Sequence, residues 1–273
     1  MQIPENRAIN INSLNGNPFP VNIELAKMNG VYCVYLTPIS ILEMLDLIPL
    51  QTFLVFNVDA NEYDGMKSVT LKQLAIKYSS YLEAFDEETL LFDKKSLVQL
   101  LTKISHYNFC LVDAGTETKI DKVIQIIDLA DKWNEKTVIN EVSANVFLSS
   151  HDDCYLYLET SDENLALELI GLQIKVLVAT VTNCPINKLK FDPKDIITKD
   201  KFSIIITQNP VKTSERATWK ILEGTFKDFV YSKEMTESEF ELVFDEPNNA
   251  IKIEKVRSRK TSDNPNLKPE IQN

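Results

Sequence analysis

Short β-branched or aromatic runs alternate with stretches of helical periodicity along the first half of the chain, and no other feature constrains the fold as strongly. Strands that feed helices, which in turn feed strands, favour right-handed crossovers between parallel strands. We therefore expect an α/β fold whose N-terminal half is a largely parallel three-layer sheet with helices on both faces. The expected strands are 30–36, 52–58 and 108–112. The expected helices are 38–48, 70–85, 93–104 and 119–135.

The pattern changes in the second half, where short strands outnumber the helices. One helix is expected at 162–170, and the turn-rich segment "DEPNN" joins the last two strands. This half is therefore expected to be mixed α+β and to end in a hairpin. The expected strands are 145–149, 154–159, 174–181, 202–207, 240–244 and 250–256.

These patterns predict three parts. Residues 1–142 form an α/β domain, and residues 143–256 form either a mixed α+β domain or a continuation of the same fold. Residues 257–273 contain two prolines and few apolar side chains, so we expect a disordered tail.

The apolar stripe of the helix expected at 70–85 predicts which of its side chains enter the core. Leu82 and Phe85 continue the helical spacing, so they are expected to be buried. The full stripe is Leu71, Leu74, Ala75, Tyr78, Leu82 and Phe85.

Several common catalytic devices are missing from the sequence. The six glycines are too far apart to build a Walker loop, a dinucleotide fingerprint or a Gly-x-Ser-x-Gly elbow. Only two histidines are present: His106 suits a helix end, and His151, beside Asp152 and Asp153, suits either a polar loop or an acid/base cluster. The four cysteines lack metal-binding spacing, so we interpret them as buried thiols.

The net charge of −11 disfavours nonspecific binding to nucleic acid, because an acidic surface repels phosphates. The exception is one basic stretch near the carboxyl end, which suits an edge strand or a contact site for an acidic partner. No apolar run is long enough to span a membrane and the first residues do not resemble a secretory signal, so we expect a cytoplasmic protein. The basic stretch comprises Lys252, Lys255, Arg257, Arg259 and Lys260.

One segment, "FCLVDAGTETKIDK" (109–122), has the residue types of a phosphate site. If the sheet is parallel, Asp59 and Asp113 follow strand ends and could share a magnesium ion. Gly115 would let the backbone approach a phosphate, which Thr116, Thr118 and Lys119 would also contact. The same residues equally suit a plain turn, with Gly115 left-handed and a threonine capping the next helix.

The string "LVDAGTETK" (111–119) is similar to the first phosphate motif of the actin, heat-shock and sugar kinase superfamily, in which an aspartate at a strand end precedes Gly-Thr. This resemblance of nine residues implies phosphate binding at Asp113, Gly115 and Thr116. The sequence departs from that family because the segment leads into a helix and no second glycine-rich loop follows.

Two hypotheses about function follow. The first is a non-enzymatic cytosolic interaction protein, such as an adaptor, an assembly component or an acidic inhibitor of a basic partner. The alternative is a magnesium-dependent enzyme or binding protein for a nucleotide or a phosphorylated small molecule, using Asp59 and Asp113. The convergence of these two carboxylates in one pocket distinguishes the two hypotheses.

Overall fold

The structure is a computed structural model that describes most of the chain. The predicted tail at 257–273 lies outside the described residues, as do Asp152, Asp153, Arg257, Arg259 and Lys260. The described ranges are 21–37, 41–61, 68–103, 106–127, 137–151, 155–195, 201–206, 209–223 and 236–256.

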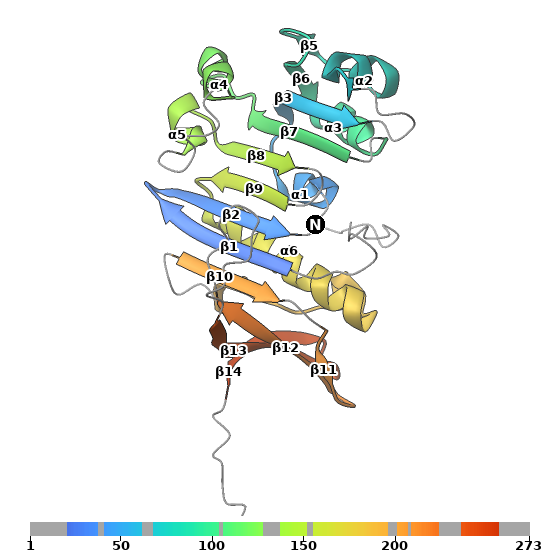
Figure 1. The fold of residues 1–273 in the computed structure, drawn as a ribbon, viewed down its shortest axis with the longest axis vertical. Helices are drawn as coiled ribbons and strands as arrows, with labels where there is room; N and C mark the ends of the chain where they lie inside the picture. Colours follow the sequence, from blue (N-terminus) through green and yellow to red (C-terminus); the bar gives the residue numbers. More distant parts are fainter. Residues whose placement is uncertain are drawn as a thin grey trace, which may run out of the picture.

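One 14-stranded sheet forms the backbone of the molecule, with the order β14-β13-β12-β10-β1-β2-β9-β8-β7-β3-β6-β5 and with β11 on β12 and β4 on β3. Figure 1 shows the strands stacked along the long axis, with β5 near one end and β14 near the other. The strands are β1 (Val21–Met28), β2 (Val31–Thr37), β3 (Thr52–Asn61), β4 (Ser68–Val69), β5 (Glu83–Ala84), β6 (Leu90–Asp93), β7 (His106–Asp113), β8 (Val146–His151), β9 (Tyr155–Thr160), β10 (Lys201–Ile206), β11 (Val211–Lys212), β12 (Arg216–Glu223), β13 (Thr236–Asp245) and β14 (Ala250–Lys255).

The expected parallel three-layer sheet is wrong, because every pairing between these strands is antiparallel. The chain crosses from β2 to β3 through a helix, but β9, β8 and β7 later fill the space between them. A continuous apolar run such as 52–58 indicates that both faces of the strand are buried. Both faces can be buried whether the neighbouring strands are parallel or antiparallel, so the run does not reveal strand direction.

Helices cover both faces of the middle of the sheet, although the sheet is antiparallel. One core joins the sheet to α1, α2, α3 and α6, and a second core on the other face joins it to α4 and α5. Successive side chains along β7 point to opposite faces of the sheet, so Leu111 enters the first core and Val112 enters the second. The helices are α1 (Ile41–Leu47), α2 (Leu71–Tyr78), α3 (Lys94–Leu101), α4 (Ile120–Ile127), α5 (Val138–Val142) and α6 (Glu163–Thr182), with 3-10 turns at Ile186–Lys188 and Pro193–Asp195.

The strand expected at 174–181 is wrong, because these residues form the second half of α6. The side chain of Asp162 accepts hydrogen bonds from the N–H groups of Asn164 (2.9 Å) and Leu165 (3.4 Å) at the helix start, and the helix continues to a left-handed Asn183. Burial of α6 against the sheet outweighs the strand preference of Ile174 and Val176.

Within the described ranges, α6 is the one helix whose length and composition would suit a membrane span, and 61% of its most apolar window is buried inside the fold. It packs against β1, β2 and β9 as the core helix of a globular protein.

The sheet also runs across residue 142, where a domain boundary is expected. Strand β1 pairs with β10, and β2 pairs with β9, so strands from both parts of the chain alternate in one sheet.

Candidate interaction site

Asp113 ends β7 as a buried carboxylate whose two oxygens are already used. The Thr118 hydroxyl donates to Asp113, 2.9 Å from Oδ1 and 3.0 Å from the main-chain oxygen. The main-chain N–H of Asn145 donates to Oδ2 at 2.7 Å, and the side-chain amide of Asn145 donates to the same oxygen. Asp113 is only 1% exposed. This carboxylate therefore ties the turn after β7 to the start of β8.

Asp59 and Asp113 lie at different ends of the β3–β7 pair. Asp113 is opposite Phe53, whereas Asp59 is opposite Asn108. The strand from residue 108 to residue 113 spans roughly 17 Å. Two aspartates at that separation cannot ligate one ion, because a metal–oxygen bond is about 2.0–2.6 Å long. The structure therefore does not bring these two carboxylates together.

The rest of the expected phosphate loop serves as a connection. The N–H of Thr118 donates to the carbonyl of Gly115 at 3.0 Å, and the N–H of Lys119 donates to the carbonyl of Val142 at 2.9 Å. Gly115 does not have the left-handed conformation that the turn interpretation assigned to it, since Gly30 is the glycine with positive φ among the described residues. Thr116 and Lys119 are exposed to solvent.

A second buried carboxylate, Glu159 on β9, was not singled out by the sequence. Its Oε1 accepts a hydrogen bond from the Tyr157 hydroxyl at 2.8 Å, and its Oε2 accepts one from the N–H of Ile139 in the first turn of α5 at 3.0 Å. Burial raises the pKa of Glu159, and these hydrogen bonds partly oppose the shift. Glu159 therefore joins the sheet to α5, as Asp113 joins β7 to β8.

The described cysteines are free thiols, of which Cys33 and Cys110 are buried as expected, whereas Cys184 is only partly buried and Cys154 lies outside the described residues. Burial raises the pKa of Cys33 to about 11, with the nearby Glu159 carboxylate adding to the shift, and raises that of Cys110 to about 12. A protonated thiol is a poor nucleophile at neutral pH. No group of three or more His, Cys, Asp or Glu side chains placed to hold a metal occurs in the part of the chain that the structure describes.

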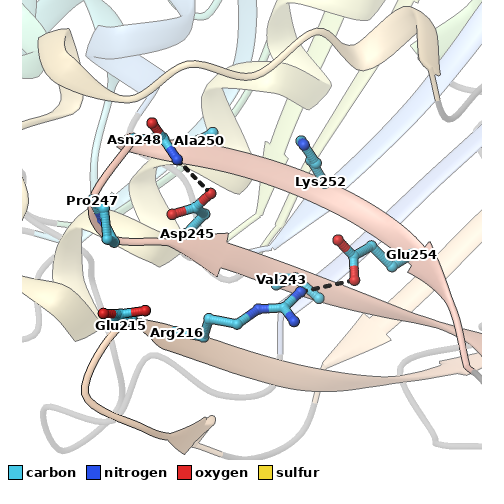
Figure 2. Close-up of a pocket in the computed structure, with 9 residues that line it drawn as sticks. All are labelled: Glu215, Arg216, Val243, Asp245, Pro247, Asn248, Ala250, Lys252 and Glu254. Atoms are coloured by element: carbon cyan, nitrogen blue, oxygen red, sulfur yellow. Dashed lines mark hydrogen bonds and ion pairs between the residues drawn. The ribbon is translucent and has the colours of Figure 1, made fainter.

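An open groove of about 520 Å³ lies on the outer face of the last three strands (Figure 2). Two of its charged groups form an ion pair, with Arg216 Nη2 2.8 Å from Glu254 Oε2, and the neutral side-chain amide of Asn248 donates to Asp245 Oδ2 at 2.9 Å. Lys252 lines the groove, and the neighbouring Lys255 is also exposed. With charges of both signs, the groove has no single electrostatic preference.

The opposite end of the sheet carries what we call the acidic tip, residues 82–88, with the sequence "LEAFDEE". All seven residues are exposed, including Leu82 (58%) and Phe85 (41%). The core placement expected for these two side chains is therefore wrong. Helix α2 ends at Tyr78, and the chain then forms the β5–β6 hairpin.

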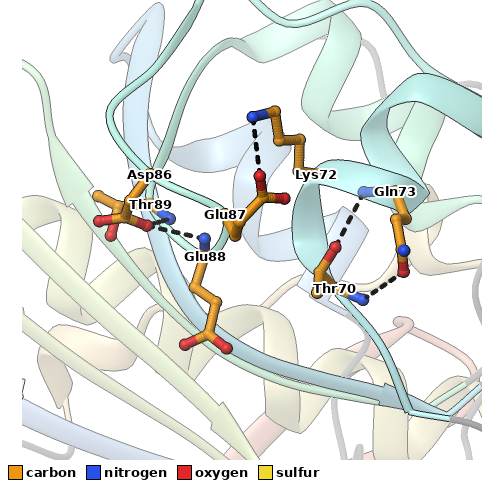
Figure 3. A network of polar contacts seen from close by, with 7 residues as sticks. All are labelled: Thr70, Lys72, Gln73, Asp86, Glu87, Glu88 and Thr89. Atoms are coloured by element: carbon orange, nitrogen blue, oxygen red, sulfur yellow. Dashed lines mark hydrogen bonds and ion pairs between the residues drawn. The ribbon is translucent and has the colours of Figure 1, made fainter.

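The acidic tip has a well-defined conformation (Figure 3). Asp86 Oδ1 accepts hydrogen bonds from the N–H groups of Glu88 (2.7 Å) and Thr89 (2.6 Å), and the N–H of Phe85 donates to the Thr89 carbonyl at 2.9 Å. Lys72 on α2 forms a 3.0 Å ion pair with Glu87. An aspartate followed by a threonine three residues later is a turn signal that could have revealed this hairpin from sequence.

Two carboxylates of the acidic tip, those of Glu83 and Glu88, make no ion pair within the described structure. The tip thus offers unneutralised negative charge beside exposed apolar side chains. Ile76 on the adjacent α2 is also 69% exposed.

Comparison of this chain with protein-family models, with curated proteins and with solved structures gives no match.

Proposed function

We propose that this chain is a non-enzymatic, cytosolic protein–protein interaction protein that binds a basic partner protein through the acidic tip. The observation that supports this proposal is the run of seven consecutive exposed residues that combines four carboxylates with Leu82 and Phe85. Exposed apolar side chains rimmed by charge are typical of binding surfaces.

The two residue types have separate roles in this proposal. Phe85 and Leu82 supply the apolar area that a partner would bury, and aromatic side chains often dominate the binding energy of an interface. The carboxylates attract a basic partner, raise the association rate and disfavour acidic competitors. Because hydrogen bonds already hold the tip in shape, little ordering of the backbone would accompany binding.

The free state of Cys33, Cys110 and Cys184 supports a cytosolic location, since the cytosol keeps thiols reduced. No observation in the structure favours the magnesium-dependent alternative: the Asp113 oxygens have internal donors, and Asp59 lies at the other end of the strand pair.

The proposal is tested by reversing the charge of the two unpaired carboxylates in the full-length chain. Affinity capture from the native cell, quantified by mass spectrometry, compares the wild type with Glu83→Lys/Glu88→Lys. The matched control is Glu117→Lys/Glu168→Lys, which makes the same change in net charge at exposed sites on other elements.

We expect at least one basic protein to be captured by the wild type and the control but not by the tip variant. Its purified form should bind the tip variant at least about tenfold more weakly, and salt should weaken the wild-type complex. A double variant, Leu82→Ala/Phe85→Ala, should weaken the same complex. Capture of the same proteins by both charge variants would rule out the acidic tip as the binding surface.

A further inference from the structure

Among the described residues, the end of the sheet farthest from the acidic tip has a partly open edge. Strand β14 is last in the strand order and pairs on one side with β13. Lys190 meets its other side, where the N–H of Lys190 donates to the Asn249 carbonyl and the N–H of Ile251 donates to the Lys190 carbonyl, both at 2.8 Å. No other described strand contacts this side of β14.

These two bonds show which backbone groups of β14 point outward. Ile251 directs its N–H away from β13, so every second residue along the strand directs its N–H and carbonyl to the same side. Ile253 is therefore oriented outward, and its outward groups have no partner in the described structure. The open part of the edge begins at Ile251, next to Lys190, and ends with β14 at Lys255. Ile253 is therefore its midpoint.

We propose that a second copy of this chain pairs with this edge, β14 against β14, in an antiparallel arrangement about a two-fold axis at Ile253. Antiparallel self-pairing satisfies the outward N–H and carbonyl of Ile253 in both copies. It extends the sheet of each copy into its partner and removes an exposed edge, which otherwise invites unspecific pairing.

The charges on β14 are complementary in this arrangement. Lys252 and Glu254 flank Ile253 and project on the same face of the strand, the face that bears the groove in Figure 2. With the axis at Ile253, Lys252 of each copy lies opposite Glu254 of the other, which forms two ion pairs.

Neighbouring registers lack this complementarity. Moving the axis by one residue places either Lys252 opposite Lys252 or Glu254 opposite Glu254, and directly opposed like charges destabilise a strand pair. Charge therefore selects the register with its axis at Ile253. In the proposed register pairing ends at Lys255, because Val256 of the second copy would otherwise lie opposite Ala250, where Lys190 already lies.

The dimer is weak because each copy contributes only the short stretch from Ile251 to Lys255. Such an area falls below the roughly 1,200 Å² of stable specific interfaces, so a dissociation constant in the micromolar to millimolar range is expected.

Sedimentation velocity of the full-length chain at increasing concentration tests the proposal. The wild type should shift from monomer to dimer. Lys252→Glu and Glu254→Lys, each alone, should weaken dimerisation at least about tenfold, because each variant carries one sign of charge at both positions. An equimolar mixture of the two variants should dimerise again, since one strand is then acidic and the other basic.

Controls separate this effect from net charge and from unfolding. Lys122→Glu and Glu168→Lys make the same charge changes at exposed sites on α4 and α6 and should dimerise like the wild type. Circular dichroism should show that Glu254→Lys, which loses its ion pair with Arg216, is folded. Ile253→Pro removes the outward N–H but no bond to β13, so it should fold and remain monomeric.

Three results would each overturn the proposal. These are a wild type that remains monomeric near 1 mM, single charge variants that dimerise like the wild type, and a mixture of the two variants that remains monomeric.

Discussion

Asp113 and Glu159 are buried near the middle of the sheet, whereas Glu83, Asp86, Glu87 and Glu88 lie exposed on the acidic tip at its edge. The buried carboxylates accept hydrogen bonds from parts of the chain that are distant in sequence, namely Asn145 and Ile139. On the tip, Glu83 and Glu88 keep their oxygens available to solvent or to a partner. The same residue type therefore supports the fold in one region and suits recognition in the other.

The strongest test of this comparison is Asp113→Ala. It should lower the free energy of unfolding by about 3 kcal/mol, because the N–H of Asn145 and the hydroxyl of Thr118 lose the buried carboxylate that accepts their hydrogen bonds. Asp86→Ala on the exposed tip should lower it by only about 1 kcal/mol, because water replaces the lost carboxylate. Urea unfolding measures the free energy of unfolding of both variants. Equal losses of stability would contradict the contrast between buried and exposed carboxylates.

Glu159→Gln tests the second buried carboxylate through pH. The pKa of Glu159 is raised in the folded protein above its ordinary value of 4.5, so between these two values the folded state binds more protons than the unfolded chain. This carboxyl group stabilises the fold below the ordinary value, and the contribution is lost as pH rises through the folded-state pKa.

Glutamine cannot titrate, so the stability of the Glu159→Gln variant relative to the wild type should rise from pH 4.5 upward, by about 1.4 kcal/mol for each unit of pKa shift. Urea unfolding at pH 4.5, 6 and 8 measures this difference. A difference that does not change with pH would show that burial of Glu159 does not alter its protonation.

Two glycine variants compare the turn between β1 and β2, which contains Gly30, with the turn after β7, which contains Gly115. Gly30 has a φ of +82° with nothing within 4 Å of an added Cβ, so Gly30→Ala should lower stability by about 1 kcal/mol through backbone strain. At Gly115 an added Cβ would meet Thr118 Oγ1 at an ordinary 3.7 Å, so Gly115→Ala should change stability by less than about 0.5 kcal/mol. A larger loss at Gly115 would mean that this turn depends on glycine.

The smallest effect is expected for Glu83→Lys/Glu88→Lys. Neither side chain supports the fold, so thermal or urea unfolding should change by less than about 0.5 kcal/mol. A larger loss would mean that the acidic tip has a structural role and would remove the contrast with Asp113.

Sequence patterns located several elements correctly. The expected starts at Thr70 and Asp93 are confirmed, since both residues cap helices through their side chains. The final hairpin, β13 with β14, also forms where the turn residues indicate it. The Asn29–Gly30 turn between β1 and β2 was overlooked, although Asn-Gly with positive φ at both residues is a strong hairpin signal.

The candidate sites were harder to predict. The sequence directed attention to Asp113 because of its neighbours, but its donor Asn145 is 32 residues away and no local pattern reveals that contact. Leu82 and Phe85 fit the spacing of α2, and only the early end of that helix shows that they are exposed.

The sequence by itself determined where local structure begins and turns, because caps, Asn-Gly pairs and prolines act on the dihedral angles of adjacent residues. The tertiary structure alone decided the antiparallel strand order, the helical state of residues 174–181 and the contrast between buried and exposed carboxylates. These features depend on burial and hydrogen bonds between distant segments, and that energy exceeds the small local preferences recorded in the sequence.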